Sequence, residues 1–318
     1  MPVPMIDFAG FLSGDRAAKT ETATAINAAC RETGFFMLAN HGLDASVIDT
    51  AFGMAAAFFD LPETEKQKIS IEKSNFHRGW YGHGGEVLDG ALQPEGDMKE
   101  GLKIGRDLPL AHPMVKAGTP LHGPNQWPDD ASFKTAMQAA YAACESLSHR
   151  LMAAFALSLG LAEDHFTPLL TLPMATLSPI RYPAARHDNL LGAGAHTDFG
   201  CLTLLMQSDE AGLEIELPDG KWLYVPFAPE LVTVNIGDMM ARWTNNLYAS
   251  TRHRVINKGT ATRHSMAFFF DPDADADLSP LPGCLAHTGE PVFAPATCLE
   301  HLMMKIEASF AYRKDAHE

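Results

Sequence analysis

Apolar residues recur with helical spacing in four segments of the chain. The spacing predicts helices over residues 17–32, 45–58, 131–160 and 297–306, because side chains three and four positions apart lie on one face of a helix. Asp44 stands where a helix N-cap is expected, and Gly34 and Gly160 follow the ends of two of these segments. The first half of the chain is therefore predicted to be mixed but largely helical.

The pattern changes at about residue 174, where short β-type runs alternate with turn signals. Strands are predicted over 175–182, 200–207, 213–216, 231–236, 252–257 and 264–270, with two earlier ones at 3–8 and 35–39. Many short strands at this spacing are typical of a β-sandwich or jelly roll. Residues 74–130 are rich in Gly, Pro and His and show little periodicity, which predicts a long loop with a functional or lid role.

The net charge and the cysteine content limit which partners and which cellular compartment are expected for this protein. The chain has 24 Lys and Arg against 39 Asp and Glu, a net charge of −15, so nucleic acid and anionic membranes are poor partners. Its 5 cysteines are an odd number without CxxC spacing, which favours reduced thiols in the cytoplasm over a disulfide framework. The N-terminus does not resemble a signal peptide, and no apolar run is long enough for a membrane span.

One motif has metal-ligand spacing. His196 and Asp198 are two residues apart, so on a strand both side chains point to the same face. A later predicted strand offers His253 as a third ligand. Two histidines and one carboxylate on one face of an octahedral ion leave positions open, the arrangement of non-haem Fe(II) oxygenases. The histidines of the 74–130 segment are expected to face solvent or be hydrogen-bonded.

A second pair lies ten residues further along the chain. Arg263 and Ser265 share one face of a predicted strand, with Ala267 and Phe269. An arginine facing an apolar β core needs an anionic partner, and a guanidinium with a hydroxyl suits a carboxylate. That anion is either a ligand or one of the protein's own acids.

These motifs together resemble one family, the 2-oxoglutarate/Fe(II)-dependent dioxygenases of the isopenicillin N synthase-like type. The resemblance covers about residues 3–310. It is carried by Gly34-Phe-Phe, Asn40-His-Gly, Gly194-Ala-His-Thr-Asp-Phe-Gly, Asn235-Ile-Gly-Asp, Ser250-Thr-Arg-His-Arg-Val-Ile-Asn257 and Arg263-His-Ser. Asn235-Ile-Gly-Asp is interpreted as a structural turn.

The resemblance implies an α+β fold: a double-stranded β-helix (jelly roll) core with flanking helices and an N-terminal mixed α/β region. We expect an N-terminal dioxygenase-type region with the substrate loop over 1–120 and a long supporting helix over 121–173. The jelly-roll Fe(II)/2-oxoglutarate domain would follow over 174–280, with a C-terminal helix and tail over 281–318.

The resemblance also implies the roles of individual residues. His196, Asp198 and His253 would hold Fe(II), and Arg263 and Ser265 would bind 2-oxoglutarate, which O₂ oxidises together with the substrate. By analogy the site would extend to further residues: Tyr182 for 2-oxoglutarate, and Arg78, Tyr81, Glu86, Phe199 and Trp243 for the substrate.

The expected activity is hydroxylation or desaturation of a small molecule by a cytoplasmic monomer or weak dimer. Arg78 and Arg106 would suit an acidic substrate and Glu86 an amine, or each would form a surface salt bridge. Residues 114–128 also resemble the ethylene-forming enzyme, but Leu88 and Ser178 replace polar residues of that enzyme. Two further alternatives are an oxidase that does not use 2-oxoglutarate and a non-catalytic metal-binding sensor.

Overall fold

The computed structural model describes residues 2–184, 191–208, 212–256, 261–285 and 288–310. In these ranges the strands form two sheets. The larger sheet has the order β1 (Met5–Asp7), β2 (Phe35–Ala39), β10 (Val232–Ile236), β7 (Leu202–Gln207), β12 (Arg263–Asp271), β5 (Met174–Tyr182), β4 (Glu100–Gly105) and β3 (Gly79–Tyr81). The smaller has the order β6 (Ala193–His196), β11 (His253–Val255), β8 (Leu213–Glu216) and β9 (Trp222–Tyr224).

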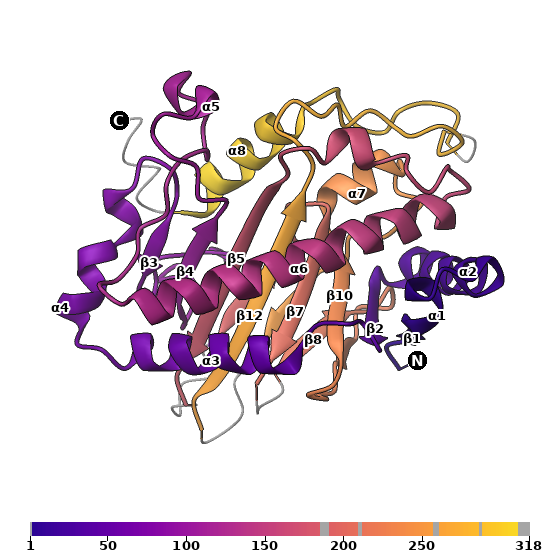
Figure 1. Cartoon of the computed structure of the whole chain (residues 1–318). Coiled ribbons are helices and arrows are strands. Elements are labelled where there is room, and N and C mark those ends of the chain that lie inside the picture. Colours follow the sequence, from indigo (N-terminus) through magenta and orange to yellow (C-terminus); the bar gives the residue numbers. More distant parts are fainter. Residues whose placement is uncertain (1, 185–190, 209–211, 257–260, 286–287, 311–318) are drawn as a thin grey trace.

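The helices surround these sheets. They are α1 (Ala9–Leu12), α2 (Arg16–Glu32), α3 (Ala45–Phe59), α4 (Glu63–Lys66), α5 (Pro113–Lys116), α6 (Ala131–Ser158), α7 (Asp238–Trp243) and α8 (Cys298–Ser309), with 3₁₀ turns at Gln67–Ile69, Ile71–Lys73 and Thr167–Leu169. Figure 1 shows α6 and α3 running across one face of the larger sheet, and α8 lying beyond the upper part of the strands. The α+β class and the jelly-roll core are thus confirmed.

The four predicted helices form where the apolar spacing put them, because each has a cap and a buried face. The Asp44 carboxylate accepts a hydrogen bond from the Ser46 N–H at 2.8 Å and begins α3. The chain leaves α2 through Gly34 at φ +68°, where a Cβ would lie 2.0 Å from the carbonyl oxygen of Ala249. Only glycine fits both that backbone conformation and that close approach.

The interpretation of residues 74–130 as a long loop is wrong. The segment contains β3, β4 and α5, and β4 pairs with β5 inside the larger sheet. All six residues of β4 are buried, including Glu100, whose carboxylate accepts hydrogen bonds from Lys66 and Trp80 at 2.7 and 2.8 Å. Charged residues and glycines inside this strand conceal its β pattern. As a result, the larger sheet extends beyond β5 through β4 to β3.

Candidate metal centre and active site

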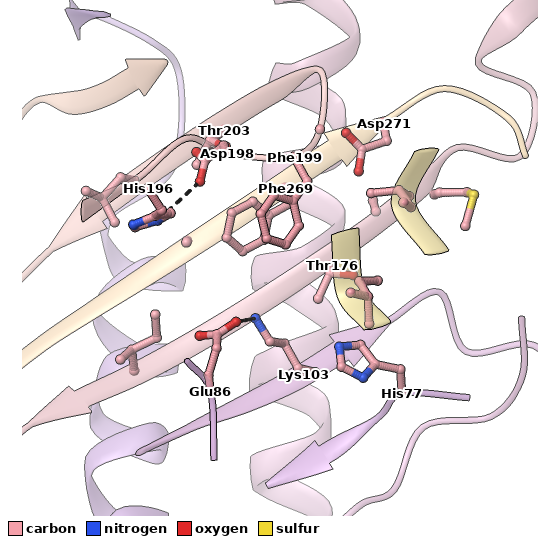
Figure 2. A pocket seen from close by; sticks show the side chains of 18 of the residues that line it. His77, Glu86, Lys103, Thr176, His196, Asp198, Phe199, Thr203, Phe269 and Asp271 are labelled. Carbon is pink, nitrogen blue, oxygen red and sulfur yellow. Dashed lines mark hydrogen bonds and ion pairs between the residues drawn. The ribbon is translucent and has the colours of Figure 1, made fainter. Parts of the chain in front are cut away.

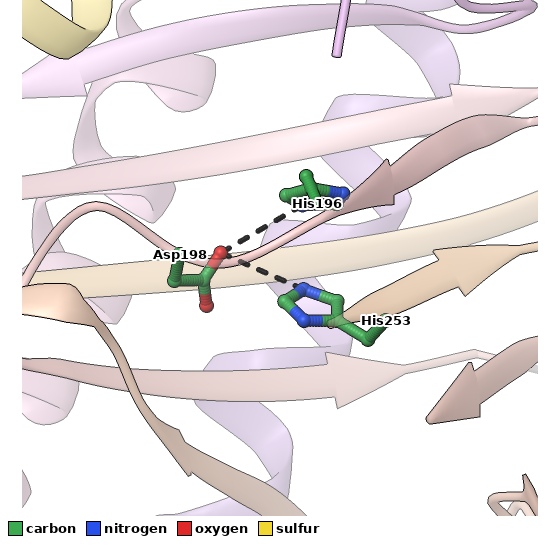
Figure 3. Close-up of side chains that lie close together, drawn as sticks. All are labelled: His196, Asp198 and His253. Carbon is green, nitrogen blue, oxygen red and sulfur yellow. Dashed lines mark ion pairs between the residues drawn. The ribbon is translucent and has the colours of Figure 1, made fainter. Parts of the chain in front are cut away.

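The three metal-ligand candidates come together between the two sheets. His196 ends β6 and His253 begins β11, and the antiparallel register of these strands places the two residues directly opposite each other. One ligand atom from each histidine and from Asp198 lies within 4.8 Å of the others. Asp198 Oδ1 is 3.8 Å from Nε2 of His196 and 3.6 Å from Nε2 of His253 (Figure 3).

His196 and Asp198 do not lie on one strand face, although the i, i+2 spacing predicts that they do. β6 ends at His196, so Asp198 reaches the cluster from the loop that follows and not from the same strand face. That loop is held by backbone hydrogen bonds, in which the N–H of Asp238 donates to the carbonyl oxygen of Asp198 at 2.9 Å. The end of β6 and the turn after it therefore bring the side chains of His196 and Asp198 together, which strand alternation alone does not do.

Both histidines are oriented by their other ring nitrogen. Nδ1 of His196 lies 2.7 Å from the carbonyl oxygen of Gly194, and Nδ1 of His253 lies 3.2 Å from that of Thr251. A proton on each Nδ1 leaves Nε2 as the lone-pair atom that faces Asp198. Burial and the neighbouring His253 lower the pKa of His196, so its ring is neutral, as a metal ligand must be.

Two side chains hold the Asp198 carboxylate. Thr203 Oγ1 and Asn235 Nδ2 each donate to Oδ2 at 2.6 Å, which leaves Oδ1 facing the histidines. Burial alone would raise the pKa of Asp198, but His253, His196 and these hydrogen bonds lower it. The group is therefore ionised and has one oxygen directed to the cluster. Two nitrogens and one carboxylate oxygen in this geometry fit Fe(II).

The Asn235-Ile-Gly-Asp motif is more than the structural turn that its sequence predicts, because it also supports the metal-ligand candidates. Asn235 donates a hydrogen bond to the carboxylate of Asp198. Gly237 lets the segment approach the loop that carries Asp198 (the metal loop), since a Cβ at Gly237 would lie 2.6 Å from the carbonyl oxygen of Asp198. Asp238 accepts hydrogen bonds from Ser250 Oγ at 2.7 Å and Lys305 Nζ at 2.6 Å. The motif therefore links the loop that carries Asp198, and the segment that precedes His253, to α8.

Arg263, Ser265 and Tyr182 line the cavity that contains the three ligand candidates. Arg263 is opposite Tyr182 in the β12–β5 register, and its guanidinium lies over the Tyr182 ring at 4.7 Å. One of its nitrogens donates to Gln207 Oε1 at 2.8 Å. Ser265 Oγ is buried and has no hydrogen-bond partner among the described residues. The Arg263 guanidinium and the buried Ser265 hydroxyl face one cavity. Together they suit the carboxylate of a ligand.

Three of the five residues predicted for the substrate line this cavity: Arg78, Glu86 and Phe199. Figure 2 shows Glu86 and Phe199 among the side chains of the wall. Neither Arg78 nor Glu86 forms a surface salt bridge, since both are buried. The Arg78 guanidinium donates to backbone carbonyl oxygens, among them that of Leu121 at 2.8 Å. Glu86 Oε2 lies 2.7 Å from the Lys99 ammonium, so Glu86 already has a cation and is not set up for a substrate amine.

Trp243 and Tyr81 are not at the cavity surface. The Trp243 side chain is 1% exposed, stacks on Phe166 at 5.1 Å and donates from Nε1 to the carbonyl oxygen of Asp277 at 2.9 Å. α7 turns this ring toward the helical core, so its prediction as a substrate contact is wrong. Tyr81 packs behind the cavity wall, with its ring 6.0 Å from that of Phe310.

Sequence reasoning missed several residues at the cavity wall, among them His77, Lys103, Thr176, Asp271 and Phe310. His77 is 5% exposed, so it does not face solvent, and its ring packs against that of Phe310 at 4.6 Å. A signal existed for Asp271, because the alternation that begins at Arg263 reaches it on the same strand face. Burial raises the pKa of Asp271 to about 7.

Comparison with known proteins agrees with this geometry. Residues 3–130 match the family model of the non-haem dioxygenase in morphine synthesis N-terminal region, and residues 174–272 match the 2OG-Fe(II) oxygenase superfamily. The 2-oxoglutarate-Fe(II) type oxidoreductase hxnY of Emericella nidulans is 34% identical, over 99% of this chain and 93% of that protein. Clavatol oxidase claD of Penicillium crustosum is 33% identical, over 97% of each.

Among solved structures, a full-length Neurospora crassa protein in complex with alpha-KG (2-oxoglutarate) and thymine has a TM-score of 0.84 and 29% identity, over 96% of each chain. The chain therefore belongs to the 2OG-Fe(II) oxygenase family. It is a 2-oxoglutarate-dependent Fe(II) dioxygenase that acts on a small molecule, with O₂ as cosubstrate. Within the described ranges, no helix is both long and apolar enough to cross a membrane.

Proposed function

We propose that His196, Asp198 and His253 bind Fe(II), and that Arg263, Ser265 and Tyr182 bind the 2-oxoglutarate carboxylate remote from the metal. The observation that carries this assignment is that both groups of side chains line one cavity, with the histidine Nε2 atoms and Asp198 Oδ1 gathered on its wall. When bound, iron, 2-oxoglutarate and O₂ would supply the oxidant that hydroxylates a C–H bond of the substrate or desaturates one of its C–C bonds.

The chain's own residues have three tasks in that reaction. The histidine Nδ1 contacts and the two hydrogen bonds to Asp198 hold the ligand atoms in position before the metal binds. Arg263 orients the cosubstrate, because a guanidinium can bind a carboxylate through two parallel hydrogen bonds. The apolar wall that includes Phe199 excludes water from the reacting centre.

The cellular setting and the assembly stay predictions. Cytoplasmic action is supported by the cysteines, all five of which are free and buried, as expected in a reducing compartment. A monomer or weak dimer, and the division of the chain at residues 120, 173 and 280, also stay predictions.

An anaerobic titration tests the assignment of residues. Metal-free protein is mixed with Fe(II) and then 2-oxoglutarate, and the weak visible charge-transfer band of the chelate is recorded. The wild type should form the band, and His196→Ala should not. His83→Ala is the matched control, since His83 is exposed and lies outside the cavity wall.

The outcomes separate the alternatives. Iron binding without a band in the wild type would contradict the role of Arg263 and favour an oxidase that does not use 2-oxoglutarate. A band that survives in His196→Ala would contradict the ligand assignment. A band without succinate release for any of a broad set of substrates would favour the sensor.

A further inference from the structure

The Lys103 ammonium lies at the wall of the cavity, beside one carboxylate and several aromatic rings. Its side chain is 10% exposed, and aromatic rings surround the ammonium, at 5.6 Å (Tyr81), 5.4 Å (Phe269) and 5.7 Å (Phe310). Its ion pair within the described residues is with Glu86 Oε1 at 3.7 Å, too long for a hydrogen bond. An ammonium has three N–H donors, so Lys103 can bind a further acceptor.

Lys103 shares Glu86 with a second lysine that lies closer to it. The other oxygen of Glu86 is 2.7 Å from the Lys99 ammonium, which also lies 3.0 Å from Asp97 Oδ2. Burial lowers the pKa of Lys103, and the carboxylate of Glu86 opposes that shift. Asp97 balances the charge of Lys99, but Lys103 has only the 3.7 Å contact to Glu86, so a closer anionic acceptor would stabilise this buried ammonium. Such an anion has access from the cavity, because Lys103 lines it.

The space beside Lys103 is bounded by flat and apolar groups. Phe199 follows Asp198, and Phe269 lies on the same face of β12 as Arg263 and Ser265. In the view of Figure 2, these two rings lie between the metal-ligand side chains and the Glu86–Lys103 pair. Leu302, Ile306 and Phe310, from and just beyond α8, complete this wall. A ligand reaching from Lys103 toward the iron site therefore passes along aromatic rings, which favour a flat partner.

We propose that the substrate is a flat aromatic or conjugated carboxylic acid whose carboxylate binds Lys103 while its ring packs against Phe269 and Phe199. This proposal deepens the proposed function and rests on it, because it concerns the substrate end of the same cavity. Lys103 holds the acid group away from the metal, and the far end of the molecule meets the oxidant.

The proposal predicts a preference for acids over their neutral amides. Protein loaded anaerobically with Fe(II) and saturating 2-oxoglutarate is titrated by calorimetry with three matched pairs. The pairs are benzoate and benzamide, trans-cinnamate and cinnamamide, and 2-naphthoate and 2-naphthamide. Saturating 2-oxoglutarate keeps Arg263 occupied, so the probes cannot bind there. At least one acid should bind the wild type about tenfold more tightly than its amide, as expected for a charge-assisted hydrogen bond.

Variants then assign the preference to one side chain. Lys103→Met should abolish it, and Lys103→Arg should retain part of it. Lys116→Met is the control, since Lys116 is an exposed lysine at the end of α5 and should leave the preference unchanged. The visible band of the Fe(II)·2-oxoglutarate complex shows in each variant that the iron end is folded and loaded.

Each outcome has a defined meaning. If no acid binds the wild type more tightly than its amide, or if the preference survives in Lys103→Met, Lys103 is a structural counter-ion of Glu86 and the proposal is wrong. If the wild type shows no band, the proposed function fails on its own, whatever the calorimetry gives. If Lys103→Met lacks the band through misfolding, the comparison of Lys103→Arg with the wild type and the wild-type acid–amide pairs decide.

Discussion

Replacement of Thr203 by valine tests whether iron affinity depends on the orientation of Asp198. Valine keeps the shape of the side chain and removes one of the two hydrogen bonds to Oδ2, the 2.6 Å bond from Thr203 Oγ1. The bond from Asn235 is retained. We expect the carboxylate to rotate more freely, so that Oδ1 is no longer held toward His196 and His253.

The magnitude follows from the kind of bond lost. A hydrogen bond to a charged group contributes about 1.5–3 kcal/mol, which corresponds to roughly 10–100-fold in an equilibrium constant. Loss of a partner that orients a metal ligand typically has an effect of the same size. Because Asn235 remains, we expect the lower end, so the Kd for Fe(II) should rise about tenfold.

The assay is anaerobic competition between the protein and a chromogenic Fe(II) chelator, with urea unfolding of the metal-free protein measured in parallel. Thr233→Val is the matched control, because Thr233 is buried in β10 and, within the described residues, makes no hydrogen bond to Asp198. The reasoning is refuted if Thr203→Val binds iron within twofold of the wild type. It is also refuted if Thr233→Val loses as much affinity.

Three further substitutions test other parts of the site. Asp271→Asn should stabilise the metal-free fold increasingly from pH 4 to pH 7, by up to about 4 kcal/mol. The folded pKa is raised from 3.8 to about 7, so the wild type loses stability as pH rises through that window; urea unfolding at pH 5 and pH 8 measures this. Gly237→Ala should lower iron affinity at least tenfold, since its Cβ would lie 2.6 Å from the carbonyl oxygen of Asp198, and unchanged affinity would contradict the close approach. Glu100→Gln, which removes the buried charge that faces both Lys66 and Arg181, should cost about 3 kcal/mol in urea unfolding, and a loss below 1 kcal/mol would count against these ion pairs.

The sequence predicted the parts of the fold that local physics decides. Helices α2, α3, α6 and α8 follow from apolar spacing and caps such as Asp44 and the capping box between Thr297 and Glu300. Strands such as β12 follow from runs of apolar and aromatic residues. β4 was missed because its buried charges, Glu100 and Lys103, are stabilised only by partners far away in sequence, which no local pattern reveals.

The same distinction applies to the site. His196, Asp198 and His253 stand in short motifs, so sequence alone brought them into one hypothesis. Asn235 was assigned to a turn because its role depends on a contact with Asp198, 37 residues earlier in the chain. Trp243 was assigned to the substrate pocket by analogy, but the direction in which α7 turns its ring is set by packing against Phe166.

The two ends of the cavity are built largely from different parts of the chain, and Phe199 and Phe269 lie between them in the view of Figure 2. The metal and cosubstrate candidates come from β5, β6, β11, β12 and the loop after β6, whereas Lys103 comes from β4 and part of the apolar wall from α8. Substitutions at Lys103 on β4 are therefore expected to change which molecule binds without moving the ligand atoms of the iron, whereas α8 is connected to the metal loop through Lys305 and Asp238. This separation accounts for one chain being similar both to a clavatol oxidase and to a Neurospora crassa protein in complex with thymine. It also explains why recognition of the iron ligands carries no information about the substrate, which depends on side chains such as Lys103.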